Sequence, residues 1–370
     1  MAGGIVRICA LALALGASIP AIAARVVDPA GARQAISLPA VAARDADLAA
    51  LAARGRSTEL AARLDLIAQD DALEAVAQEW LLDRGLHALA RLAPSPAARA
   101  TVTRLTARTP VVYTRVDPDH GERATPLYDA GATARFVLRN WERAAARAAA
   151  AAGLAARDTR VVARFADESS GAARAGTADA FRSAPLAEVA AQRPAIAGAQ
   201  AAGRRVDALA LIAAGRLADP ALFGLLIDYA DEPEALAAVA AAPRALDSAA
   251  ALETLAHASR RADIASAAVL AAGRLAAEDP AARRFLFGAL SDPGIAPSAA
   301  AALGALGDPG VSAEVGRRLA AARTDAERRL LLLALRLDAS PGARTELERF
   351  ARAGKGSPRV QAKAQRWLEQ

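Results

Sequence analysis

Residues 264–275 read IASAAVLAAGRL, and three later stretches share their texture: residues 295–306 (IAPSAAAALGAL), 326–337 (AERRLLLLALRL) and 357–368 (SPRVQAKAQRWL). Each stretch ends on a leucine, so a leucine recurs every 31 residues. A fixed period of this length is typical of proteins built from stacked structural repeats. Residues 206–217 (VDALALIAAGRL) nearly duplicate the first stretch, which places the start of the repeats at residue 206.

Short breaks that contain proline separate these stretches from a second set of apolar stretches. The breaks are Asp219-Pro220, Asp279-Pro280, Asp308-Pro309 and Ser340-Pro341. Asp and Ser accept hydrogen bonds from the free N–H groups in the first turn of a helix. Proline in the next position loses nothing, because its missing donor would be unpaired there. Six residues beyond each proline stands an apolar side chain: Leu226, Leu286, Val315 and Leu347. The predicted unit is therefore helix, tight turn, helix.

This unit resembles the short HEAT-like repeats first described in phycobilisome lyases, most closely over residues 301–319 (AALGALGDPGVSAEVGRRL). The resemblance covers residues 206–370 and implies a fold without a function, because repeats of this type serve many roles. No functional residue is carried over from that family. One hairpin cannot bury its apolar face alone, so neighbouring hairpins must stack. We expect a mainly α protein: an α-solenoid of stacked helix hairpins, with an N-terminal helical region and a small β-hairpin insertion.

The chain before the repeats is less regular. Residues 24–40 are predicted to be an irregular leader, residues 159–166 a strand and residues 167–178 a link. Between them, residues 109–129 (TPVVYTRVDPDHGERATPLYD) have two β-prone flanks around a turn-rich centre, which predicts a β-hairpin or an ordered loop. The expected domains are a signal peptide (1–23), a helical region (24–108), the β-hairpin insertion with a long helix (109–168), a linker and helical transition (169–205) and the repeats (206–370).

The first residues have the features of a secretory signal. Arg7 gives a positive start, residues 8–19 are apolar, and Ala21 and Ala23 are small residues at the positions that signal peptidase reads. The apolar run is too short to span a bilayer. Cys9 lies inside this segment, so the mature chain would have no cysteine for disulfides or zinc sites. We expect cleavage near Ala23 and a location in the periplasm.

Charge is spread along the chain. The formal net charge is +6, and the arginines alternate with Asp and Glu instead of forming a basic run with aromatic residues. This pattern is typical of a solvated helical surface and does not favour nucleic acid as a partner. Weak attraction to an anionic envelope surface is the remaining electrostatic expectation.

One cluster of chemically active residues stands out: Asp117, Asp119, His120 and Glu122 in VDPDHGE. Carboxylates and an imidazole this close could bind a metal or transfer protons. The alternative that we favour is an ordinary turn, since Asp-Pro and His-Gly are common turn pairs. We expect no metal and no cofactor.

Stacked hairpins present an extended surface, and we expect partners to dock on the wall formed by the second helix of each unit. Arg284, Glu314, Arg318 and Arg349 are the candidate partner-binding residues there, unless they are merely solvated. The sequence thus favours a non-enzymatic periplasmic scaffold or adaptor that binds a protein partner. Two alternatives stay open: an envelope enzyme or accessory domain with its site in residues 109–129, and a binder of anionic envelope surfaces.

Overall fold

The computed structural model describes residues 25–115 and 124–369, and this part of the chain is mainly helical. The chain forms two compact units, Met1–Glu142 and Arg143–Gln370, which are described in turn. The predicted signal peptide, residues 1–23, lies outside the described residues.

The first unit is a helical layer around a large apolar cluster, with a smaller cluster between α1, α4 and β2. Its helices are α1 (Pro29–Ile36), α2 (Pro39–Ala53), α3 (Ser57–Ala68), α4 (Ala75–Leu89), α5 (Pro96–Leu105) and the first part of α6 (Ala130–Ala155). Helix α3 packs against α4 and α5, and α2 packs against α4. Trp141 of α6 is buried in the core, where its indole Nε1 donates to the carbonyl oxygens of Leu89 and Leu92 at 3.2 and 3.0 Å.

A small sheet lies beside these helices. It consists of β1 (Arg25–Val26), β2 (Val112–Arg115) and β3 (Ala124–Pro126), in the order β1-β2-β3. Strand β2 pairs antiparallel with β3, which confirms the predicted β-hairpin. Strand β1 pairs parallel with β2 and was not predicted.

The predicted irregular leader at residues 24–40 is wrong, because helix α1 and the start of α2 occupy it. The Asp28 side chain caps α1 by accepting from the Gly31 N–H at 2.6 Å, and Pro29 is the first helical residue. This Asp-Pro pair is the same start signal that marks the repeats.

The second unit begins with the end of α6 and three further helices, α7 (Arg160–Asp167), α8 (Gly171–Ser183) and α9 (Leu186–Ala201). The predicted strand at residues 159–166 is therefore wrong. Val161, Val162 and Phe165 are buried together at helical spacing, so packing overrides the β preference of the valines.

The predicted link at residues 167–178 is also wrong, since most of it lies in α8. Ser170 caps this helix by accepting from the Ala173 N–H at 3.3 Å. Gly176 lets α8 approach α6 closely, because a β-carbon there would lie 2.1 Å from the Arg143 carbonyl oxygen. A composition of small residues therefore reflects close helix packing at this point.

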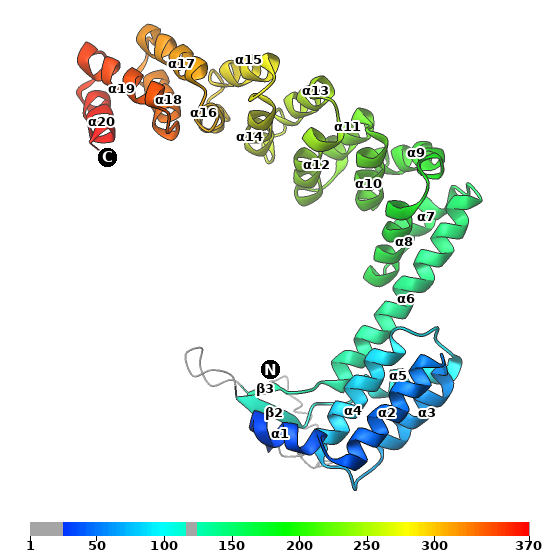
Figure 1. The fold of residues 1–370 in the computed structure, drawn as a ribbon. Helices are drawn as coiled ribbons and strands as arrows, with labels where there is room; N and C mark the ends of the chain where they lie inside the picture. The colour runs from blue at the N-terminus through cyan, green and yellow to red at the C-terminus, as the bar shows by residue number, and fades with distance from the viewer. Residues whose placement is uncertain (1–24, 116–123, 370) are drawn as a thin grey trace, which may run out of the picture. The chain divides into compact units, whose positions relative to one another are not determined.

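Stacked helix hairpins follow, as predicted (Figure 1). The helices are α10 (Asp207–Leu217), α11 (Pro220–Tyr229), α12 (Glu232–Ala245), α13 (Ser248–Ala258), α14 (Ala265–Leu275), α15 (Pro280–Ala289), α16 (Ala296–Gly304), α17 (Pro309–Ala321), α18 (Asp325–Leu337), α19 (Pro341–Ala353) and α20 (Pro358–Leu368). The first helices of the hairpins (α10, α12, α14, α16 and α18) pack one on the next in a row. The second helices (α11, α13, α15, α17 and α19) form another row.

The predicted caps are confirmed in all four copies. Asp219, Asp279, Asp308 and Ser340 each accept a hydrogen bond from a backbone N–H of the helix that follows. The apolar residues six positions beyond the prolines are all buried: Leu226, Leu286, Val315 and Leu347.

Helix α12 continues two residues past Pro243, to Ala245. Pro243 stands in the last turn of the helix, where a single backbone hydrogen bond is lost and the end follows within three residues. Pro243 therefore lies just before the turn between α12 and α13 and is not its first residue.

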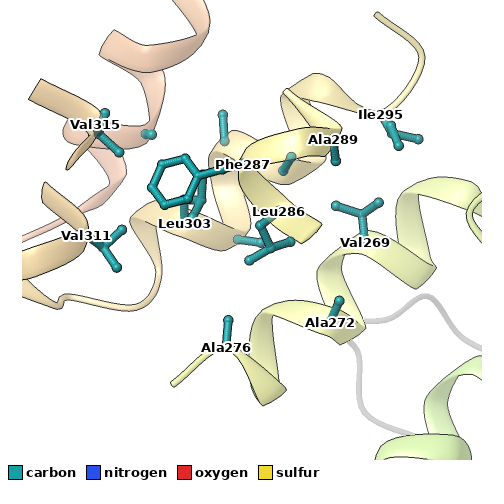
Figure 2. Close-up of a cluster of buried hydrophobic side chains, with 14 of the residues drawn as sticks. Val269, Ala272, Ala276, Leu286, Phe287, Ala289, Ile295, Leu303, Val311 and Val315 are labelled. Atoms are coloured by element: carbon teal, nitrogen blue, oxygen red, sulfur yellow. The ribbon is translucent and has the colours of Figure 1, made fainter. Parts of the chain in front are cut away.

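The core of the repeats is built from small side chains and a few large ones. Figure 2 shows Phe287 and Leu286 of α15 reaching toward Leu303 of α16, with Val311 and Val315 of α17 close by. One apolar cluster continues in this way from Ile227 to Ala364. Each hairpin therefore buries its apolar face against the next one, which is how a stack of repeats is stabilised.

Candidate binding site

The row of second helices is loosely packed at α15. Helix α15 packs against α14 and α16, but it makes few contacts with its row neighbours α13 and α17. Helices α17 and α19 pack directly on one another by contrast. Gly316 of α17 makes room there for the buried Glu346 of α19, whose Oε2 lies 2.2 Å from the place that a β-carbon would take.

The space between α15 and α17 is a groove of about 530 Å³ that is open to solvent. Its walls come from the end of α15, the end of α17 and the start of α18. The apolar surface is formed by Phe287, Leu290, Ala322, Leu330 and Leu331. Partly exposed apolar side chains along a concave surface are typical of sites that bind a ligand or a partner.

Arg318 forms one rim of this groove. Its guanidinium carbon lies over the Phe287 ring, 4.4 Å from the ring centroid. Its Nε donates to Oε1 of Glu314 at 2.7 Å, and Arg317 donates to the other oxygen of the same carboxylate at 2.6 Å. These two arginines hold the pKa of Glu314 below its ordinary value. The ring and the carboxylate together hold the Arg318 side chain at the mouth of the groove.

The opposite rim is the start of α18. Oε2 of Glu327 accepts from the backbone N–H groups of Arg323 and Thr324, and Thr324 Oγ1 accepts from the Glu327 N–H in return. These backbone hydrogen bonds lower the pKa of Glu327. The carboxylate is thus engaged by the helix start, while the guanidinium group of Arg323 has no hydrogen bond or ion pair within the described part of the chain.

The structure brings together two of the four predicted partner-binding residues. Glu314 and Arg318 form an ion pair beside the groove. Arg284 is exposed on α15, one turn before Phe287. Arg349 lies on α19, where it pairs with Glu346. The four residues therefore do not form one cluster, and Arg349 belongs to the α17–α19 contact.

The apolar part of the site was not predicted. Leu290 and Leu330 lie next to the ends of α15 and α17–α18, where sequence periodicity indicates only that a helix stops or starts. The alternative site cluster, Asp117, Asp119, His120 and Glu122, lies outside the described residues.

Two other hollows differ in character. One of about 360 Å³ lies between α2 and α4, has alanine, leucine and charged side chains in its walls and contains the Arg84–Asp45 ion pair. Another of about 460 Å³ lies between α11 and α13, where small and polar residues line it and His257 Nε2 lies 2.6 Å from Oδ1 of Asp228. The α15–α17 groove is the one among these three that combines two half-buried leucines, Leu290 and Leu330, with the edge of an aromatic ring, Phe287.

No family model, curated protein or solved structure matches this chain. None of the helices in the described ranges combines the length and apolar character needed to cross a membrane. Function is therefore inferred from the residues of the groove and from the sequence.

Proposed function

We propose that the protein is a non-enzymatic scaffold or adaptor of the bacterial periplasm, and that it binds a protein partner through the surface of its HEAT-like repeats. The observation that carries this proposal is the α15–α17 groove, an apolar hollow of about 530 Å³ on the repeat surface with charged side chains at its mouth. An apolar centre with a polar rim is the usual anatomy of a protein interface.

The titratable side chains of the groove support binding in preference to catalysis. They are Arg318, Arg323 and Glu327. Arginine stays protonated at physiological pH and cannot act as a general base. The pKa of Glu327 is lowered further from neutrality by its backbone hydrogen bonds, whereas a general acid or base works best near the operating pH.

The arginines elsewhere in the second unit support a solvated surface more than a face for polyanions. Arg193 pairs with Asp219, Arg261 with Asp263 and Arg283 with Asp308. Each such pair neutralises a positive charge locally, which weakens attraction to anionic lipid or lipopolysaccharide. The periplasmic location is supported by the signal-like features around Arg7 and Ala23.

A photo-cross-linking amino acid in place of Ala321 tests the proposal. Ala321 is exposed and lines the groove, whereas the neighbouring Ala320 is exposed and does not line it, so position 320 is the matched control. With a periplasmic extract we expect position 321 to capture one protein saturably, and the purified pair to form a complex of defined stoichiometry. Absence of any saturable adduct, together with turnover of an envelope polymer by the purified protein, would contradict the proposal.

A further inference from the structure

We infer that the α15–α17 groove takes an acidic amphipathic helix of the partner, which presents large apolar side chains to the groove and carboxylates to its rim. This inference rests on the proposed function and adds the chemistry of the partner.

The surface inside the groove calls for large apolar side chains. Leu290 and Leu330 are half-buried, and Phe287 and Leu331 are almost buried, so their remaining exposed surface gathers in one place. Ala321 and Ala326 have short side chains that leave the mouth open. Leucine or phenylalanine side chains of a partner would remove this surface from water, which is the main source of affinity at such sites.

The walls favour a helix over an extended peptide. A strand gains affinity mostly by pairing its backbone with the free edge of a sheet. The walls of this groove are the ends of α15 and α17 and the start of α18, so they offer no strand edge to a bound peptide. A bound segment must therefore satisfy its own backbone groups, as a helix does. Side chains at positions i, i+3 or i+4 and i+7 would then face the groove.

The rim favours negative charge. Arg318 uses Nε for Glu314, and its two terminal nitrogens have no partner among the described residues. The guanidinium of Arg323 is likewise unpaired in the described ranges. The carboxylates nearby are already engaged, Glu327 by backbone N–H groups and Glu314 by arginines. A carboxylate on the partner can form a two-pronged pair with a guanidinium, whereas a lysine there would be repelled.

Fluorescence anisotropy with three labelled peptides tests the inference on the purified protein. The first is a helix-forming peptide with leucines at i, i+4 and i+7 and glutamates elsewhere. The second has lysines in place of the glutamates, and the third has alanines in place of the leucines. We expect saturable binding of the first peptide, and binding of the other two to be at least about tenfold weaker.

Two variants locate the binding. Ala321→Trp fills the groove and should weaken binding of the acidic peptide at least about tenfold, whereas Ala320→Trp, just outside the groove, should leave it unchanged. The double variant Arg318→Glu/Arg323→Glu should reverse the preference, so that the lysine peptide binds better than the glutamate peptide. Circular dichroism shows whether each variant keeps its helix content.

Equal binding of the acidic and basic peptides, or binding that Ala321→Trp does not change, would overturn the inference. A partner captured by cross-linking that binds the Ala321→Trp variant as well as the unmodified protein would also overturn it, while leaving the scaffold proposal in place. Failure to capture any partner, with the acidic peptide still bound in the groove, would count against the scaffold proposal alone.

Discussion

Single aspartates link the start of a helix to the neighbouring hairpin. Asp308 accepts from the backbone N–H of Gly310 at 2.7 Å and of Val311 at 3.4 Å, which satisfies free donors at the start of α17. Its other oxygen lies 2.8 Å from Nη1 of Arg283 on α15. Asp279 likewise caps α15 by accepting from the Ala281 N–H, and it accepts a hydrogen bond from the Ser248 hydroxyl of α13 at 2.5 Å. One side chain thus stabilises a helix and fixes its place in the stack.

Removal of the Asp308 carboxylate should loosen α17. We expect Asp308→Ala to lower the free energy of opening of this helix by about 1–2 kcal/mol, because two backbone donors lose their acceptor. Asp308→Asn should cost less, since asparagine caps as well as aspartate and loses only the charge. Hydrogen exchange of the α17 amides, followed by mass spectrometry, measures both. Equal losses in the two variants would show that the cap itself contributes little.

The same carboxylate makes stability depend on pH. The backbone hydrogen bonds from Gly310 and Val311, with Arg283 nearby, hold the pKa of Asp308 below its ordinary value. A carboxyl with a lowered pKa in the folded protein stabilises it fully above the unfolded pKa, about 4, and this stabilisation is lost as the pH falls through the folded value. The difference in stability between the unmodified protein and Asp308→Ala should therefore shrink below about pH 4. A difference that stays constant down to pH 2 would contradict this assignment.

The charged residues of the site could be predicted from sequence better than its apolar ones. Arg318 and Glu314 are four residues apart on a predicted helix, so their pairing follows from helical geometry. The exposure of Leu290 and Leu330 follows instead from the gap between α15 and α17. That gap depends on packing between residues about 30 positions apart, which no local pattern contains.

At the next scale, helices approach each other as closely as their smallest residues allow. Gly304 of α16 faces α18, where a β-carbon would lie 2.5 Å from the carbonyl oxygen of Ala334 and 2.8 Å from Cβ of Leu337. Gly224 of α11 has no atom within 4 Å of that position. Gly304 is the last residue of α16 and Gly224 lies in the middle of α11, and only Gly304 is in close contact with a neighbouring helix.

Gly304→Ala and Gly224→Ala should therefore act in opposite directions. Alanine favours a helix over glycine by about 0.8–1.0 kcal/mol, so Gly224→Ala should raise the free energy of unfolding by up to that amount. At Gly304, the last residue of α16, the clash with α18 should outweigh any gain in helix propensity and lower the free energy of unfolding by about 1–3 kcal/mol. Urea unfolding followed by circular dichroism measures both changes. A stabilised Gly304→Ala variant would contradict the close α16–α18 contact.

The elements that repeat were predictable, and those that do not repeat were less so. Three capped prolines and four regularly spaced leucines define α14 to α20 from sequence, and a fourth capped proline starts α11. Helix α7 occurs once, and its valines favour a strand until the buried face of Val161 and Phe165 is known. Asp28-Pro29 carries the same start signal as the repeats, but it stands alone before a short helix and was read as part of a leader.

At the scale of the whole molecule, the repeats of the second unit are stabilised by their neighbours in the chain. Helix α20 packs against α18 and α19, with Val360 and Ala364 buried. Its other side is charged and carries Arg359 and Arg366, which are exposed. A stack of this kind has a stability that is nearly a sum of local terms.

Deletion of α20 should accordingly have a local effect. We expect amide exchange to accelerate in α18 and α19, which lose the cover that Val360 and Trp367 of α20 give them, and to stay unchanged in α10 to α14. Leu286→Ala, in the middle of the stack, provides the comparison, because it should weaken both sides of α15 by about 2–5 kcal/mol. Uniform acceleration after loss of α20 would indicate a single cooperative globule.

Hydrogen exchange of the purified protein, with and without the saturating acidic helix peptide, tests the binding role of the stack most directly. We predict slower exchange confined to the end of α15, the end of α17 and the start of α18, which together form the groove around Phe287 and Arg318. Protection centred on the α11–α13 hollow or on the first unit, or no protection at saturation, would contradict a partner site between α15 and α17.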